Sequence, residues 1–181
     1  MVDFSQNYFA LLGMPVCFTL DAGSLAARYR DLQKVVHPDR FAASGEQSQR
    51  LSLQRATLVN EAYHTLKDPL RRAQYLLEIK TGEPLGEQAT LDDPEFLMRQ
   101  MALREALAEI SGLDDAQEKL AALMDEIDTL IKTEIARLTV QFESSSPDQL
   151  TGAAQSVQKM QFLSKLRIEA EAIEADLEED Y

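Results

Sequence analysis

Apolar residues recur at intervals of three and four along most of this sequence, which is the spacing of one face of an α-helix. The longest of these stripes comprises Leu120, Leu123, Ile127, Leu130 and Leu138. No segment shows the alternation of apolar and polar residues that is typical of a half-buried β-strand. The sequence therefore predicts an all-α fold.

Capping residues divide these stripes into separate helices. A capping side chain followed by proline, which suits the first position of a helix, occurs at Asp68-Pro69, Asp93-Pro94 and Ser146-Pro147. Gln149 would complete a capping box with Ser146. Asp21 is predicted to cap a helix that ends before Pro38. Ser5 is predicted to cap a short first helix that runs to Leu12, with Gly13 as its left-handed stop.

One segment between these helices has the composition of a linker. Residues 81–92 concentrate glycine, proline and polar residues, which favour turns over helix. They separate residues 1–80, with four predicted helices, from residues 93–181, with three longer ones. Three long helices joined by short turns favour an antiparallel bundle. The sequence therefore predicts two helical domains.

Charge is divided unequally between these two parts. Residues 1–80 hold 10 Lys and Arg against 8 Asp and Glu, whereas residues 81–181 hold 8 against 23. An acidic C-terminal part would repel phosphate backbones, so nucleic acid is not expected as a partner. The acidic surplus has two open explanations, solvation of exposed helix faces or selection of a partner.

The sequence also indicates in which cellular compartment the protein is expected. No apolar run approaches the roughly 20 residues that a membrane span needs, so no membrane partner is expected. The first residues lack the basic and apolar segments of a signal peptide. The single cysteine, Cys17, excludes an internal disulfide. We therefore expect a cytoplasmic protein.

The tripeptide His37-Pro38-Asp39 follows a predicted basic helix. Because proline ends the helix, the histidine and the aspartate can both project from the start of a loop. A hydrolytic His–Asp dyad would also need a nucleophile or a metal, and two histidines and one cysteine are too few for a typical site. No metal and no cofactor are expected. Without further context, a structural turn would be the simpler interpretation.

The context of this tripeptide resembles the J domain. The matching strings are YFALLGMP, YRDLQKVVHPDRF and NEAYHTLKDPLRRAQY, and they fall in the family's order within residues 4–80. The resemblance implies that a DnaK-like chaperone ATPase is bound and stimulated by five residues, His37, Pro38, Asp39, Arg30 and Lys34. Two positions depart from the family. Val36 stands where tyrosine is more frequent, and Asp31 lies within the positive face.

Residues 94–110 present two apolar faces when they are drawn as a helix. Phe96, Leu103, Leu107 and Ile110 cluster on one face, the expected core stripe. The second face is made of Leu97, Met98 and Met101, and is continued by Glu105 and Glu109. This face either packs against other helices or stays exposed for a partner, with methionines supplying adaptable contacts. The periodicity alone leaves both open.

The C-terminal part resembles the HscB family of co-chaperones, through PEFLMRQMALREALAEI and a last helix containing VQKMQFLSKLR. The resemblance implies that an iron–sulfur scaffold protein of the IscU type is bound by six residues, Leu97, Met98, Met101, Glu105, Glu109 and Phe162. Ala102 departs from the family, where an acidic residue is common. The implied function is a non-enzymatic co-chaperone that delivers the scaffold to a chaperone of the HscA type and stimulates its ATPase. The alternative is a J-domain co-chaperone whose client is unrelated to iron–sulfur assembly.

Overall fold

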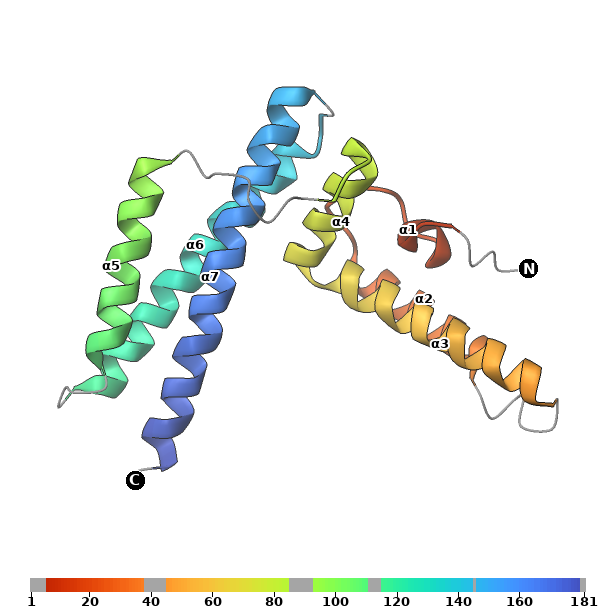
Figure 1. Ribbon diagram of the computed structural model, residues 1–181, viewed down its shortest axis with the longest axis horizontal. Coiled ribbons are helices and arrows are strands. Elements are labelled where there is room, and N and C mark those ends of the chain that lie inside the picture. The colour runs from red at the N-terminus through yellow and green to blue at the C-terminus, as the bar shows by residue number, and fades with distance from the viewer. Residues whose placement is uncertain (1–5, 38–44, 85–92, 111–114, 145, 180–181) are drawn as a thin grey trace. The chain divides into compact units, whose positions relative to one another are not determined.

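The computed structural model describes residues 6–37, 45–84, 93–110, 115–144 and 146–179. These residues form helices and contain no strand, which confirms the predicted all-α fold (Figure 1). The helices are α1 (Tyr8–Leu11), α2 (Ala22–Val36), α3 (Glu46–Lys67), α4 (Pro69–Thr81), α5 (Pro94–Ile110), α6 (Ala116–Gln141) and α7 (Pro147–Glu179). The chain divides into two compact units, unit 1 (Met1–Pro84) and unit 2 (Leu85–Tyr181). Part of the predicted linker, residues 85–92, lies outside the described residues.

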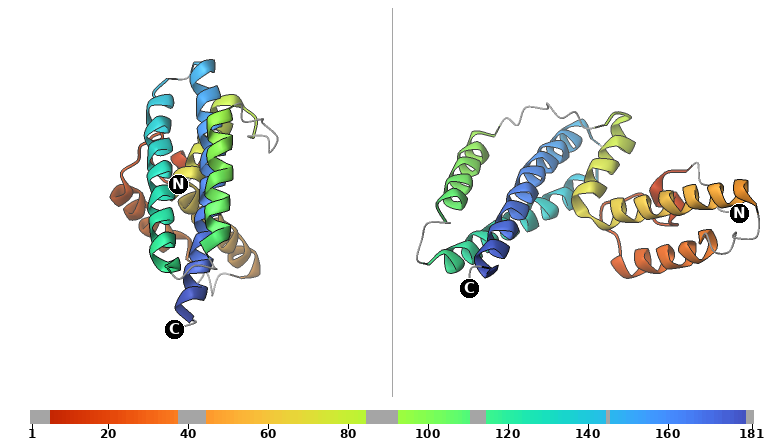
Figure 2. Two further views of the ribbon diagram at one scale, coloured as in Figure 1. Left: turned by 90° about the vertical axis from the view of Figure 1, so that its left-hand side faces the viewer. Right: turned by 60° about the horizontal axis from the view of Figure 1, so that its bottom comes forward.

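Unit 1 is built on an antiparallel pair, α2 and α3 (Figure 2). Tyr29 of α2 stacks on Tyr63 and donates a hydrogen bond of 2.9 Å to Asn60 Oδ1. Val36, seven residues later in α2, meets Ser52, which lies earlier in α3, so the two helices run in opposite directions. α1 and α4 both pack against α3. The core of this unit includes Phe9, Leu12, Phe18, Leu25, Val59, Ala62, Leu66, Leu76 and Leu77.

The predicted caps are mostly confirmed. The carboxylates of Asp21, Asp68 and Asp93 accept hydrogen bonds of 2.6 to 2.9 Å from backbone N–H groups three residues further on. Ser146 Oγ accepts one of 3.4 Å from the N–H of Gln149, which forms one half of the predicted capping box. Each of these side chains satisfies an N–H group that has no partner within its helix.

The predicted cap of the first helix is wrong, and the helix ends one residue earlier than predicted. α1 begins at Tyr8 and ends at Leu11, and its cap is Asn7, whose side chain accepts a hydrogen bond of 2.9 Å from the N–H of Ala10. Ser5 itself lies outside the described residues. Serine and asparagine both suit this position, so composition does not distinguish two candidates that lie two residues apart. Gly13, with φ of +62°, takes the expected left-handed conformation after the helix.

Unit 2 is a three-helix bundle (Figures 1 and 2). Contacts between α5 and α7 join residues about 66 positions apart, as in Asp93 with Lys159 and Phe96 with Phe162, so these helices are parallel. α6 runs in the opposite direction, and it is tied to α7 by Asp128 and Arg167. The core includes Phe96, Leu103, Leu107, Ile110, Leu120, Leu123, Met124, Ile127, Leu163, Leu166 and Ala170. The predicted core stripe of α5 is therefore confirmed.

Across the described parts of both units, no helix has the length and apolar character that are needed to span a membrane.

Candidate functional site

The residues expected to bind a chaperone lie at and near the end of α2. His37 directly follows the helix and is exposed, whereas Pro38 and Asp39 lie outside the described residues. Arg30 and Lys34 are both exposed and are four residues apart, so they share a face of α2. The structure thus places three of the five expected residues on the surface along the last two turns of α2 and directly after it.

Asp31 modifies the charge of this face. Its carboxylate forms an ion pair of 3.1 Å with Nζ of Lys34, one turn further along α2. Both side chains are largely exposed, so the pair contributes little to stability. Its effect is to place a negative charge beside one of the two expected cationic contacts.

A buried serine positions the end of α2. Ser52 of α3 is 2% exposed, and its hydroxyl donates a hydrogen bond of 2.7 Å to the backbone carbonyl of Val36. Val36 is the last residue of α2 and is itself buried, so this contact holds the backbone from which His37 departs. Ser52 was not among the residues predicted from the sequence. Its signal is a polar residue seven positions before Val59, on the buried face of α3.

The second apolar face of α5 is exposed within unit 2. Leu97 is 45% exposed, Met98 74% and Met101 67%, whereas the core stripe on the other side of the helix is buried. We call Leu97, Met98 and Met101 the apolar face of α5. Glu105 and Glu109 are also exposed and continue the same side of the helix by one and two turns. The face therefore combines an apolar part with an acidic part.

A shallow hollow of about 360 Å³ lies beside this face, between α5 and α7. It is lined by Gln100, Met101, Arg104, Glu105 and Phe162, so it brings together three of the residues expected to bind a scaffold. Phe162 is half-buried, and its ring meets that of Phe96 edge to face, with the ring centroids 6.1 Å apart. Arg104 donates hydrogen bonds of 3.0 and 3.1 Å to Glu169, so the cation at this border is already paired.

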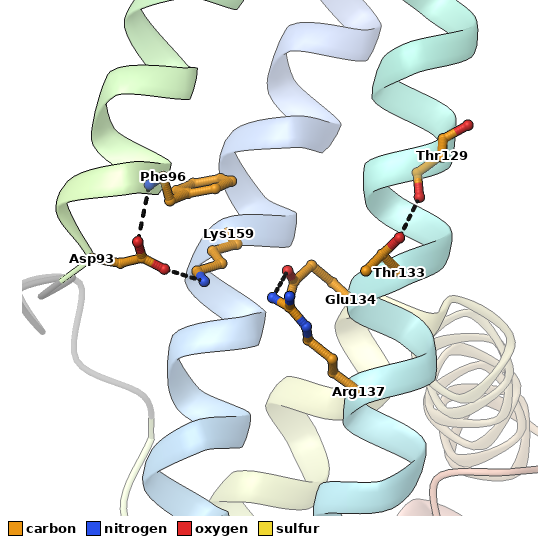
Figure 3. A network of polar contacts seen from close by, with 7 residues as sticks. All are labelled: Asp93, Phe96, Thr129, Thr133, Glu134, Arg137 and Lys159. Carbon is orange, nitrogen blue, oxygen red and sulfur yellow. Dashed lines mark hydrogen bonds and ion pairs between the residues drawn. The ribbon is translucent and has the colours of Figure 1, made fainter.

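The start of α5 is held to α7 by a polar contact (Figure 3). Asp93 accepts a hydrogen bond from the N–H of Phe96 with one oxygen and one from Nζ of Lys159 with the other. Lys159, followed by the N–H of Phe96, lowers the pKa of the Asp93 carboxyl. Nζ of Lys159 also lies 5.3 Å from the centre of the Phe96 ring, a cation–π distance. The sequence predicted Asp93 as a cap, but its partner Lys159 was not predicted.

The described residues contain no group of three or more His, Cys, Asp or Glu side chains that could hold a metal ion. The surface at the end of α2 in unit 1 carries exposed cations and a histidine. The surface on α5 in unit 2 carries exposed apolar and acidic side chains. Such groups suit the binding of other proteins, in which a few anchors supply most of the energy.

Comparisons with known proteins agree with this description. A family model described as "HSCB C-terminal oligomerisation domain" matches residues 92–171. A co-chaperone protein HscB homolog of Aliivibrio salmonicida is 43% identical over 172 residues, which cover 95% of this chain and 99% of that relative.

Two solved structures are also similar to this chain in fold. Chaperone HscB from Vibrio cholerae has a TM-score of 0.83 at 38% identity and covers 95% of this chain and 99% of its own. Human co-chaperone protein HscB has a TM-score of 0.84 at 28% identity, over 95% of this chain and 84% of its own. The chain therefore belongs to the HscB family, the co-chaperones of iron–sulfur cluster assembly.

Proposed function

We propose that this protein binds an iron–sulfur scaffold protein of the IscU type, delivers it to a DnaK-like chaperone of the HscA type and stimulates that chaperone's ATPase. In this role it assists the maturation of iron–sulfur proteins in the cytoplasm. It catalyses no reaction itself, since ATP and the iron–sulfur cluster are bound by its partners. Residues 1–80 act as the J domain, residues 81–92 as a linker, and residues 93–181 bind the scaffold.

The observation that carries the proposal is the exposure of the apolar face of α5. Three large apolar side chains on one helix, each at least 45% exposed, are more than the folding of unit 2 requires. Contiguous exposed apolar residues with a polar rim are typical of protein-binding surfaces. The neighbouring hollow adds Phe162 and Glu105 to this surface, so apolar and acidic contacts are available together.

On the chaperone side, we propose that His37, Pro38 and Asp39 contact the ATPase and that Arg30 and Lys34 add attraction to an acidic partner surface. The exposure of His37, Arg30 and Lys34 supports this assignment. Opposite charges on two partners speed their association and select the right one more than they add affinity.

The test uses the purified full chain, a scaffold of the IscU type and a chaperone of the HscA type. Calorimetry measures scaffold binding to the wild type and to a triple variant with Leu97→Ala, Met98→Ala and Met101→Ala. Each anchor is expected to contribute on the order of 1–2 kcal/mol or more to binding, so the triple variant should lose several kcal/mol. Its stability should change little, since exposed substitutions usually stay within about 0.5 kcal/mol each.

A double variant with Val140→Ala and Ile168→Ala is the matched control, because these side chains are 60% and 65% exposed in unit 2 but lie outside the apolar face of α5. It should bind the scaffold as the wild type does. Equal binding by the triple variant and this control would contradict the proposed scaffold surface. A wild-type chain that neither binds the scaffold nor stimulates the chaperone would contradict the proposed function as a whole.

A further inference from the structure

A cavity of about 610 Å³ lies between α5, α6 and α7, next to the start of α5. Its walls include the apolar side chains of Phe96, Leu130 and Leu163, and its polar lining includes Glu134 and Lys159. Met98 lines the cavity too, although it is 74% exposed on the apolar face of α5. Met98 therefore belongs to both surfaces, so the cavity adjoins the apolar face of α5 at this residue.

Glu134 is an unusual residue for its position. It belongs to the buried side of α6, seven residues after Ile127 and four before Leu138, and is 5% exposed. Its Oε1 accepts a hydrogen bond of 2.7 Å from Nη1 of Arg137 (Figure 3). Its Oε2 is buried and, among the described residues, has no hydrogen-bond partner. A buried carboxylate oxygen without a donor is costly, so this atom is a ready acceptor for a ligand.

The charges around the cavity favour a cation. Each of the three lining cations already has a carboxylate partner: Lys159 pairs with Asp93, Arg137 with Glu134, and Arg99 with Glu126. Glu95, which is exposed, also lines the cavity and has no ion pair within the described residues. The lining holds as many carboxylates as cations, but Arg99 is engaged by Glu126, which lies outside the lining. With Glu126 included, four carboxylates face three cations, so an anion would add to a surplus of one negative charge and a cation would offset it.

The residues that line the cavity indicate which kind of cation it would bind. Lysine and arginine combine an apolar stem with a charged end that carries several N–H donors. The stem suits walls made of Phe96 and Leu163, and the charged end suits the buried acceptor oxygen of Glu134, which lines the same cavity. A small inorganic cation would leave the apolar walls without contact.

We propose that this cavity receives a lysine or arginine side chain of the scaffold protein, which donates a hydrogen bond to Oε2 of Glu134. The inference rests on the proposed function, because the side chain belongs to the protein that docks on the apolar face of α5. The cavity then acts as a specificity site. The apolar face supplies contact area, and Glu134 selects a partner with a basic residue at the matching place.

The test compares scaffold binding to the wild type and to Glu134→Gln by calorimetry. Glutamine keeps the shape and an acceptor for Arg137 but removes the charge, so binding should weaken about tenfold or more. Circular dichroism and the Tm check that the variant is folded. Glu118→Gln, an exposed substitution on the same helix that removes the same charge, is the control and should bind normally.

The basic residues of the scaffold are then replaced one at a time by methionine. One replacement should weaken binding to the wild type and have no further effect on Glu134→Gln, which identifies the inserted side chain. If no basic residue of the scaffold couples to Glu134 in this way, the inference is wrong. It is also wrong if Glu134→Gln binds normally while the triple variant of the apolar face loses binding, although the proposed function then stands. A wild-type chain that does not bind the scaffold overturns both.

Discussion

The hydroxyl of Ser52 and the carbonyl of Val36 form a buried hydrogen bond of 2.7 Å between α3 and the last residue of α2. His37 comes next in the chain and is exposed. The contact thus connects the packed interior of unit 1 with the first residue of the proposed chaperone-binding tripeptide. Through this hydrogen bond, α3 helps to position His37, although His37 is not part of α3.

Replacing Ser52 by alanine should therefore affect both stability and function. The carbonyl of Val36 would lose its donor in a buried place, so the free energy of unfolding should fall by about 1–3 kcal/mol. Stimulation of the chaperone ATPase should also fall, because the end of α2 is held less firmly. Urea unfolding and an ATPase assay measure the two effects. Ser48→Ala, one turn earlier on α3, is the control, and an equal loss there would contradict the role of Ser52.

Replacement of His37 by glutamine should abolish most of the ATPase stimulation and leave the fold intact. The side chain is exposed at the end of α2, so its loss disturbs little packing. Asp39→Asn should have the same effect. His64→Gln is a matched control, because His64 is the other histidine of the chain and is also exposed. Near-normal stimulation by His37→Gln, with an unchanged circular dichroism spectrum, would contradict the proposed contact.

Residues 1–84 should fold without the rest of the chain. They contain their own core around Phe9, Leu66 and Leu76, and α4 ends in this unit with Gly82 in the left-handed conformation. We expect a helical fragment with a cooperative thermal transition, measured by circular dichroism. It should stimulate the chaperone weakly, and addition of the scaffold should not increase that stimulation. An unfolded fragment would show that unit 1 depends on residues beyond Pro84.

Phe162→Ala should reduce both stability and scaffold binding. The ring is half-buried against the core and meets Phe96 edge to face, so its removal should cost about 1–3 kcal/mol of unfolding free energy. Met101→Ala, in the same hollow, should lower binding with a change in stability within about 0.5 kcal/mol. Urea unfolding and calorimetry on both variants separate packing from binding. Equal loss of stability in the two variants would contradict a packing role that belongs to Phe162 and not to Met101.

The contact between Asp93 and Lys159 predicts a dependence of stability on pH. The pKa of the Asp93 carboxyl is lowered in the folded chain, whereas an aspartate in the unfolded chain titrates near about 3.9. The ionised carboxylate therefore stabilises the fold fully above the unfolded pKa, and this contribution is lost as the pH falls through the lower folded pKa.

Asp93→Asn removes that contribution. The difference in unfolding free energy between the wild type and this variant should be largest near pH 6 and should shrink toward pH 3, as measured by urea unfolding. Asp125→Asn, an exposed substitution on α6, controls for the change in net charge. A difference that stays constant over this range would contradict a stabilising role for the ionised Asp93.

The helices and most of their starts could be predicted because the interactions that form them are local. Asp21, Asp68 and Asp93 each cap an N–H group only three residues away, so the sequence contains both partners within one turn. The stripe of Phe96, Leu103 and Leu107 likewise follows from the period of a helix. Asn7 shows where local reasoning fails, since more than one nearby residue suits the same cap.

The contacts that build the candidate surfaces depend on which helices meet. Ser52 bonds to a carbonyl 16 positions away, and Lys159 and Phe162 reach α5 from about 66 positions away. Polar residues on the buried faces of α3 and α6 mark Ser52 and Glu134 in the sequence, but their partners follow only from the packing of helices.

The sequence by itself determined the all-α fold, the two faces of α5 and the tripeptide after α2, because periodicity, capping and proline act within a few residues. Only the tertiary structure decided that Leu97, Met98 and Met101 stay exposed within unit 2 and that Phe162 lies beside Met101. It alone showed that one oxygen of Glu134 is buried and has no donor within the described ranges of the chain. Burial is a property of the assembled helices, since the same apolar side chain is core or surface according to which neighbour covers it.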